Sequence, residues 1–494
     1  MNLFSISING VSMSNESFYN NKKSLGLLFS SLSLILFLFV IAYALFKPGI
    51  GYDDYYTLGI IRLPLMDMIS ATAVNVHPPL YYIILKVFSK IFNPLDNQSL
   101  VLLGKIVSLI PIALILAVSF TKIKKEFGLL AAGLFSFLIV SSFNVMVYST
   151  VIRMYSWGLF FITIQLIYLY DIIHRKDTKI AWIVFTIASI CSTYTHYFSA
   201  IASIIIYLVL FAYLLHSNRK ELKKWIVSTI VSLVAYLPWM GILLSQVSTV
   251  SDHYWIKPIG FDTVISYIDF IFSPSVGIIG RILEIFLIVL LIALVYLSLK
   301  NKKSSDDYVN FSLISMSIIF LTMIAGIVLS FLIRPIFVSR YILPCFGGLW
   351  LGVAILLAKC FDNRNRSKTS YDFDTRKVFY FGILLILIVS AFSAMSFIGT
   401  SSADYNETLG HYQFFDSIND GRTVIFDDEL SYLRYSPYLD RDNCVLDTHL
   451  KSTDKYGGGD TVIFVKINFD KIEKSNYHCK KIFEIYQDEV YSFA

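Results

Sequence analysis

Charged residues are scarce in this sequence, and their scarcity restricts the class of protein. Asp, Glu, Lys and Arg make up 15% of the 494 residues, whereas a soluble domain usually has about 25%. Hydrophobic residues make up 56%. A soluble protein could not bury that much apolar surface in globular cores, so the lipid bilayer must be the main solvent of this chain.

Cysteines are few, and nucleotide-binding motifs are absent. The sequence has five cysteines and no CxxC or His/Cys spacing typical of a zinc site. The triplet Gly457-Gly458-Gly459 lacks the flanking residues of a phosphate-binding P-loop. The net charge of +6 is explained by basic loops beside membrane spans and does not indicate a nucleic-acid partner. We therefore expect no metal, no organic cofactor and no nucleic acid.

Apolar runs long enough to cross a bilayer recur along almost the whole chain. We interpret about 11 of them as transmembrane helices, the first as a retained signal anchor rather than a cleaved signal peptide. The runs are residues 25–45, 99–120, 128–145, 152–173, 180–194, 197–215, 225–244, 279–299, 311–333, 341–357 and 378–397. The expected fold class is an all-α polytopic membrane domain followed by a small carboxyl-terminal α/β domain.

Clusters of Lys and Arg occur at every second connection between these runs. They lie at residues 22–23, 122–125, 175–179, 219–224, 300–303 and 364–377. Basic residues next to spans stay on the cytoplasmic side, so the amino terminus and these connections are predicted to be cytoplasmic. The protein is thus predicted to be a multi-pass protein of the cell membrane, with the intervening connections and the carboxyl-terminal tail outside the cytoplasm.

The chain divides into three predicted segments: a cytoplasmic amino terminus (1–24), a membrane domain (25–398) and an extracytoplasmic domain (399–494). Within the membrane domain, the outward loop 47–98 is too long for a simple connector. It contains two stretches with apolar residues at helical spacing, 63–73 and 80–92, which are expected to lie at the membrane interface.

The carboxyl-terminal tail is long enough for a small domain. Four stretches read as strands, 423–426, 444–446, 461–465 and 481–486, and three as helices, 406–418, 429–435 and 469–475. This mixture predicts an α/β domain. Cys444 and Cys479 both lie in this tail, where an oxidising environment permits a disulfide, so we expect them to pair.

Polar residues at membrane depth are costly, and here they gather in the outward connections. Asp53 and Asp54 follow the first span, and repulsion between adjacent carboxylates raises the pKa of one of them, which suits a general base. His77 precedes Pro78-Pro79 at the start of a predicted helix, a place that suits an anion such as phosphate. Taken alone, the acidic pair is more often a solvated turn at the end of a span, and His77 could be an ordinary helix cap or a buried, hydrogen-bonded histidine.

Further candidates lie at the outward ends of later spans: Arg153, Tyr155, His196, Arg340 and Tyr341. The arginines could instead extend toward lipid headgroups. His196 could be a polar residue that packs between helices.

The order of these motifs resembles the polyprenol-dependent glycosyltransferases of the GT-C fold, in particular family 39-like enzymes such as protein O-mannosyltransferases and the aminoarabinose transferases of lipid A. The resemblance covers residues 25–357 and is carried by the acidic pair and HPPLYY (77–82). RMYS (153–156), THYF (195–198) and SRYILP (339–344) support it.

The resemblance implies residue roles. Asp53 occupies the position of the catalytic base, and Asp54 replaces the usual Glu beside it. His77 stands where the aminoarabinose transferases have a Lys that contacts the donor phosphate. Arg153 and Arg340 correspond to outward arginines that contact the phosphate or the sugar. The mechanism requires these four residues to converge on one cavity at the membrane surface.

The implied activity is inverting, metal-independent transfer of a sugar from a polyprenyl-phosphate-linked donor to an acceptor hydroxyl of a protein, lipid or cell-surface glycan. A glycosidase needs two carboxyl groups because a sugar alkoxide leaves poorly. A polyprenyl phosphate leaves as a stable anion, so one base and cations for the phosphate are sufficient. Two alternatives stay open: a transporter or flippase of lipid-linked glycans, and a polysaccharide polymerase or ligase.

Overall fold

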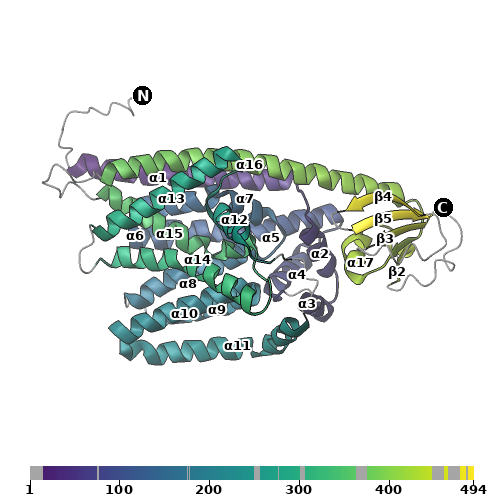
Figure 1. Ribbon diagram of the computed structural model, residues 1–494, viewed down its shortest axis with the longest axis horizontal. Coiled ribbons are helices and arrows are strands. Elements are labelled where there is room, and N and C mark those ends of the chain that lie inside the picture. The colour runs from purple at the N-terminus through teal and green to yellow at the C-terminus, as the bar shows by residue number, and fades with distance from the viewer. Residues whose placement is uncertain are drawn as a thin grey trace.

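The protein is a bundle of long helices with a small sheet at one end (Figure 1). The structure is a computed structural model that describes residues 15–74, 77–174, 176, 178–249, 256, 258–275, 277–300, 306–362, 375–447, 461–465, 479–485 and 488–493. Each predicted span overlaps a separate long helix. These helices are α1 (Asn15–Phe46), α5 (Asn97–Val118), α6 (Lys124–Ser141), α8 (Tyr155–Ile173), α9 (Thr178–Thr195), α10 (Tyr197–Ser217), α11 (Leu222–Thr249), α13 (Ile278–Lys300), α14 (Asp307–Leu332), α15 (Phe346–Asp362) and α16 (Thr375–Ile418).

Nine stretches of helix within the described residues are long and apolar enough to cross a membrane, so the chain is a multi-pass membrane protein. One of them, Asn97–Ser141, covers two predicted spans. It contains the π-helical turn η1 (Ser119–Ile123) and a break at Gly128, where φ is 87°. The predicted span 180–194 lies in α9, which is not one of the nine. The two counts differ for two reasons. One stretch joins two predicted spans across a kink, and α9 is not apolar enough to be counted.

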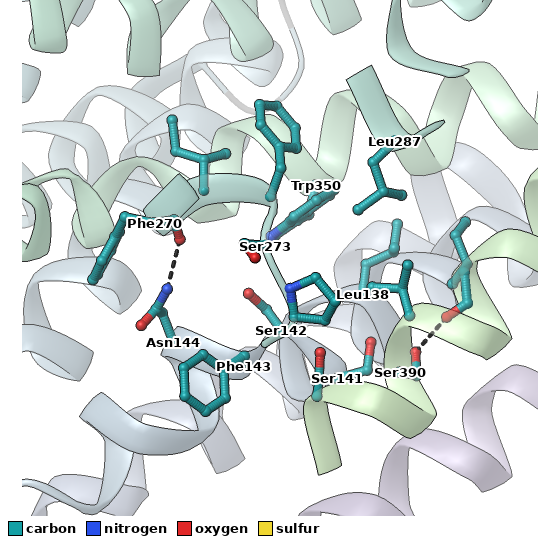
Figure 2. Close-up of a pocket in the computed structure, with 16 residues that line it drawn as sticks. Leu138, Ser141, Ser142, Phe143, Asn144, Phe270, Ser273, Leu287, Trp350 and Ser390 are labelled. Atoms are coloured by element: carbon teal, nitrogen blue, oxygen red, sulfur yellow. Dashed lines mark hydrogen bonds between the residues drawn. The ribbon is translucent and has the colours of Figure 1, made fainter. Parts of the chain in front are cut away.

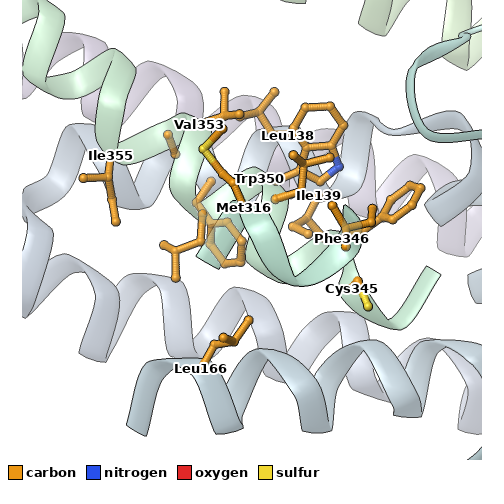
Figure 3. Packing of buried hydrophobic residues seen from close by; sticks show 14 of the residues in the cluster. Leu138, Ile139, Leu166, Met316, Cys345, Phe346, Trp350, Val353 and Ile355 are labelled. Atoms are coloured by element: carbon orange, nitrogen blue, oxygen red, sulfur yellow. The ribbon is translucent and has the colours of Figure 1, made fainter. Parts of the chain in front are cut away.

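Helix α15 lies inside the bundle, and residues 341–358, which include most of it, are all buried; Figure 3 shows part of this packing. Small residues let its neighbours approach closely. A Cβ on Gly347 would lie 1.8 Å from Thr163 Oγ1 of α8, and one on Gly352 would lie 2.4 Å from Met316 Cγ of α14. The 3-10 helix η3 (Ser339–Cys345) leads directly into α15, so this packing also fixes the position of η3.

The basic connections meet at the end of the bundle away from the sheet. Lys22 near the start of α1 pairs with Asp362 at the end of α15 (2.6 Å), and Lys122 in η1 pairs with Asp171 near the end of α8 (2.5 Å). Long-range contacts of this kind agree with the alternation of charge in the sequence, because they join connections that are both predicted to be cytoplasmic.

Three short helices of the loop 47–98 lie between the bundle and the sheet (Figure 1). They are α2 (Tyr52–Ile60), α3 (Leu65–Val74) and α4 (Leu80–Phe92). The two predicted helices of this loop are confirmed, whereas α2 was not predicted. Two other short helices that were not predicted are α7 (Phe143–Thr150) and α12 (Phe261–Phe272). Exposed apolar side chains on α3 and α4, such as Met66 and Ile91, are typical of interfacial helices.

The carboxyl-terminal domain contains a five-stranded mixed sheet with the order β2-β1-β3-β5-β4. The strands are β1 (Val424–Phe426), β2 (Cys444–Leu446), β3 (Thr461–Val465), β4 (Cys479–Ile485) and β5 (Asp488–Phe493), with α17 (Glu429–Tyr435) after β1. Strands β2, β1 and β3 are parallel, and β5 and β4 are antiparallel. The four predicted strands are confirmed and β5 was not predicted; the predicted helix 469–475 lies outside the described residues.

The predicted disulfide between Cys444 and Cys479 is wrong for this sheet. Cys444 begins β2 and Cys479 begins β4, and these strands form opposite edges. Four strand spacings of about 4.8 Å put the two strands roughly 19 Å apart, whereas bridged cysteines have Cα atoms within about 7 Å. Sequence position alone could not reveal the strand order.

The carboxyl-terminal domain shares a core with the loop 47–98. Tyr55 of α2 packs against Phe415 of α16 and Tyr435 of α17, with ring centroids 6.4 and 5.6 Å away. Helix α16 runs without a break across the predicted boundary at residue 398 into this core. The backbone of α17 also approaches α2 closely, since a Cβ on Gly59 would lie 2.0 Å from the carbonyl oxygen of Leu433.

Because α2 and α17 approach so closely, adding a single methyl group at Gly59 is predicted to destabilise the protein. Gly59→Ala should lower the free energy of unfolding by about 3 kcal/mol, because α17 must move away from α2. Thermal unfolding of the purified protein in detergent measures the change. Gly410→Ala in α16 is the matched control, since its Cβ meets open space and should stabilise by up to about 1 kcal/mol. Equal unfolding temperatures for the two variants would show that α2 and α17 are not in close contact.

Candidate active site

The two acidic residues at the start of α2 have different environments. The Asp54 side chain is buried (1% exposed) and accepts hydrogen bonds from the backbone N–H groups of Gly51 (3.1 Å) and Ile152 (2.8 Å). Burial raises the pKa of Asp54, and the nearby charge of Lys105 partly opposes this rise. The side chain of Asp53 is 37% exposed. Asp54 therefore caps and anchors the helix, while Asp53 remains accessible to a substrate.

Arg153, which lies between α7 and α8, holds Asp53 in place. Its guanidinium is 2% exposed, and Nη2 lies 3.1 Å from Asp53 Oδ1. Nη1 donates to the hydroxyl groups of Tyr82 (2.6 Å) and Thr57 (3.3 Å). One buried cation thus joins α2, α4 and the segment before α8.

The same guanidinium contacts His77, because Arg153 Nη2 lies 3.1 Å from His77 Nε2. An arginine can only donate hydrogen bonds, so Nε2 must accept, and this requires a neutral imidazole. Burial lowers the pKa of His77 well below its usual value, and the charge of Arg153 lowers it further. His77 therefore cannot supply the positive charge of the Lys that the family resemblance implied at this position.

An aromatic group continues the site from His77. His196, the N-cap of α10, has its ring 6.3 Å from that of His77 and 4.6 Å from that of Tyr341 in η3. Tyr155 at the start of α8 lies 6.0 Å from His196. The guanidinium of Arg340 lies 5.7 Å from the ring of Tyr341 and interacts electrostatically with Asp53. The eight residues predicted from separate motifs thus form one continuous group.

A large, mostly apolar cavity begins at this group. Its volume is about 640 Å³, and residues of α9, α10, α11 and α14 line it. His77, His196 and Tyr341 lie at one end, and Tyr207 and Trp225 line the other. The lining residues of α11 run from 225 to 247, which is about 33 Å along a helix and close to the thickness of the hydrocarbon core.

Of the residues in the aromatic and acidic group, only His77, His196 and Tyr341 line the cavity. Asp53 and Arg153 lie behind His77, and Arg340 is not a lining residue either. The four residues expected to converge, Asp53, His77, Arg153 and Arg340, lie together in one polar cluster that meets this cavity at His77. That all four line one cavity stays a prediction.

A second cavity is too small for a sugar. It lies where the junction of α6 and α7 meets α12 and α15, and its volume is about 30 Å³ (Figure 2), enough for one or two water molecules. Beside it, Asn144 Nδ2 donates to the carbonyl oxygen of Phe270 (2.6 Å). This small cavity therefore belongs to the joint between α7 and α12.

Two residues near the site were not identified as candidates from the sequence. Lys105 lies inside the apolar run of α5, buried, with Nζ 3.6 Å from Asp54 Oδ2. A charge within a membrane span is costly and marks a functional or structural partner, so this lysine was a usable signal. Arg334, at the end of α14, lines the cavity, and its position at a predicted outward span end was the same signal that identified Arg340.

Comparison with known proteins identifies the fold. No protein family and no curated protein matches the sequence. The structure is similar to that of ArnT from Cupriavidus metallidurans bound to undecaprenyl phosphate, with a TM-score of 0.58 and 11% identity over 94% of this chain and 97% of the other. The apo state of the same protein gives a TM-score of 0.57 and 12% identity over the same shares. The chain therefore has the GT-C fold that its motif order predicted.

The buried pair of Asp54 and Lys105 yields a prediction on stability. Asp54→Asn should lower the free energy of unfolding by roughly 3 kcal/mol, because the Lys105 ammonium stays buried without its partner. The double variant Asp54→Asn/Lys105→Met should regain most of this loss. Thermal unfolding in detergent compares both with wild type; an unchanged Asp54→Asn, or a double variant no better than the single one, would contradict the pairing.

Proposed function

We propose that this protein is a membrane glycosyltransferase that moves a sugar from a polyprenyl-phosphate-linked donor to an acceptor hydroxyl. The observation that carries the proposal is the meeting of two features at His77. On one side is an apolar cavity about as long as a bilayer is thick, and on the other is an accessible carboxylate, Asp53, held by Arg153. A long isoprenoid chain and a deprotonated acceptor need these two environments side by side.

The reaction needs few protein groups. Asp53 takes the proton of the acceptor hydroxyl as its oxygen attacks the anomeric carbon of the sugar. The bond between that carbon and the phosphate oxygen breaks, and its electron pair leaves with the polyprenyl phosphate. The leaving group is a stable anion, so no general acid is required. Attack opposite to the leaving phosphate inverts the anomeric carbon.

The ion pair with Arg153 serves this chemistry through position. A carboxylate on an exposed helix end would sample several rotamers, whereas the contact with a buried, fixed guanidinium restricts Asp53 to one orientation. A base must be within reach of the acceptor proton, and the contact with Arg153 promotes this condition.

The fold supports a lipid-linked donor. The ArnT structure to which this chain is similar contains undecaprenyl phosphate. A polyprenyl tail in the cavity between α9, α10 and α11 would place its phosphate near His77, at the end of the bundle that carries the sheet. We propose accordingly that this end lies outside the cytoplasm, with the amino terminus (1–24) inside and the domain from residue 399 outside.

Replacement of Asp53 tests the proposal. Membranes that contain the wild-type protein are first screened with radiolabelled polyprenyl-phosphate sugars to find the donor that is used. Asp53→Asn should then lower transfer about 100- to 10,000-fold. Because Asp53 is also the carboxylate that pairs with the buried guanidinium of Arg153, the unfolding temperature is expected to fall as well, and transfer is compared at a temperature where the variant is folded. Asp67→Asn, an exposed acidic residue of α3 in the same loop, is the matched control and should keep wild-type transfer.

Near-normal transfer by Asp53→Asn would remove this residue from the mechanism. Absence of transfer by the wild type across the whole panel would count against the glycosyltransferase itself.

A further inference from the structure

The first turn of α2 contacts three buried cations that come from three separate parts of the chain. Two of them belong to the membrane domain and pair with Asp53 and Asp54. The third contacts the residue before the base, because the guanidinium carbon of Arg434 lies 3.8 Å from the centre of the Tyr52 ring. Arg434 lies in α17, so the carboxyl-terminal domain reaches the helix that carries Asp53.

The side chain of Arg434 is buried against aromatic rings of α2. Arg434 is 4% exposed, and its guanidinium carbon lies 6.0 Å from the centre of the Tyr56 ring as well. The face of an aromatic ring attracts a cation, and the attraction is stronger when water is excluded. Arg434 can therefore act directly on α2, whereas a substrate in solution has little access to it.

The backbone of α17 contacts the opposite end of α2. The carbonyl oxygen of Leu433, the residue before Arg434, lies against Gly59. Just after α17, the carbonyl oxygen of Pro437 accepts a hydrogen bond from Asn97 Nδ2 at the start of α5 (2.9 Å). Helix α17 thus contacts both ends of α2 and is tied to a helix of the membrane domain, so it can fix the orientation of α2.

The position of Asp53 depends on that orientation. Asp53 directly follows Tyr52, and its carboxylate lies at hydrogen-bonding distance from Arg153. A small rotation of the first turn of α2 would separate the two groups. Misplacement of a catalytic group by about 1 Å can lower a rate about 100-fold, so a residue that holds Tyr52 affects the base without touching it.

We propose that Arg434 is a positioning residue for Asp53. It holds Tyr52, and with it the start of α2, in the orientation in which the carboxylate meets Arg153 and reaches the acceptor. This assignment rests on the proposed function, because the role of Asp53 as the base belongs to that proposal. The carboxyl-terminal domain is then part of the catalytic unit through α17.

Chemical labelling of Asp53 tests the assignment without any transfer of sugar. The full-length protein in detergent is treated with a water-soluble carbodiimide and glycine ethyl ester, and the labelling rate of each carboxyl group is measured by mass spectrometry. Arg434→Gln should raise the rate at Asp53 about 3- to 10-fold, because its contact with Arg153 is weakened. The rates at Asp67 and Asp262, which are exposed on α3 and α12, should stay unchanged.

Transfer kinetics provide the second measurement. With the donor found in the screen, Arg434→Gln should lower kcat per folded protein about 10- to 100-fold with little change in the KM of the donor. Arg434→Lys keeps the charge but not the planar stacking, so it should lose about 3- to 10-fold; it also serves if Arg434→Gln does not fold. Arg422→Gln, an arginine of the same domain that pairs with Asp420, is the matched control and should behave like wild type.

A double variant shows whether Arg434 acts through Tyr52. Tyr52→Leu removes the ring and should lower kcat about as much as Arg434→Gln. If one contact accounts for both losses, Tyr52→Leu/Arg434→Gln should be no slower than either single variant. Losses that multiply in the double variant would show that Arg434 acts elsewhere and would contradict the assignment.

The remaining outcomes separate this assignment from the proposed function. Unchanged labelling of Asp53 with unchanged kcat per folded protein would mean that Arg434 only attaches the domain, and the assignment fails. A raised KM of the acceptor with unchanged labelling would make Arg434 a substrate contact, which also overturns it. Increased labelling of Asp53 in a protein whose wild type transfers no sugar would support the link between Arg434 and Asp53 and contradict the proposed function instead.

Discussion

The buried guanidinium of Arg153 is the interaction on which the rest of the site depends. It touches the carboxylate of Asp53, the hydroxyls of Thr57 and Tyr82, and the imidazole of His77. These partners come from a loop and from two short helices that also share a hydrophobic core. A buried cation is costly unless several partners surround it, so the same requirement that stabilises Arg153 also assembles the residues around the accessible acid.

The membrane restricts where the polar cluster around Arg153 can lie. Apolar helices fill the hydrocarbon layer, and α15, whose residues 346–358 are all buried, fixes η3 and hence Tyr341. Charged side chains then lie mostly near the ends of the bundle, and the sheet domain covers one of these ends through its shared core with α2. The cavity between α9, α10 and α11 is the feature that extends from this end into the apolar layer.

Much of this arrangement could be predicted from the sequence, because a bilayer imposes a strict pattern of apolar runs and basic loops. The positions of the long helices, of α4 and of four strands follow from local patterns. Local patterns could not show that β2 and β4 lie at opposite edges of the sheet, which excludes a disulfide between Cys444 and Cys479. The sequence motifs identified the residues of the polar cluster, but only three-dimensional packing shows which of these residues are buried and which line the cavity.

A structure of the protein with undecaprenyl phosphate bound, determined by electron cryo-microscopy in lipid nanodiscs, tests the central claim most directly. The claim is that one end of an apolar cavity brings a lipid phosphate next to an accessible base. We expect the isoprenoid tail between α10 and α11, with the phosphate at the end of the cavity next to His77 and the carboxylate of Asp53 near it. A lipid phosphate bound elsewhere, with the cavity between α10 and α11 filled by side chains, would contradict the account.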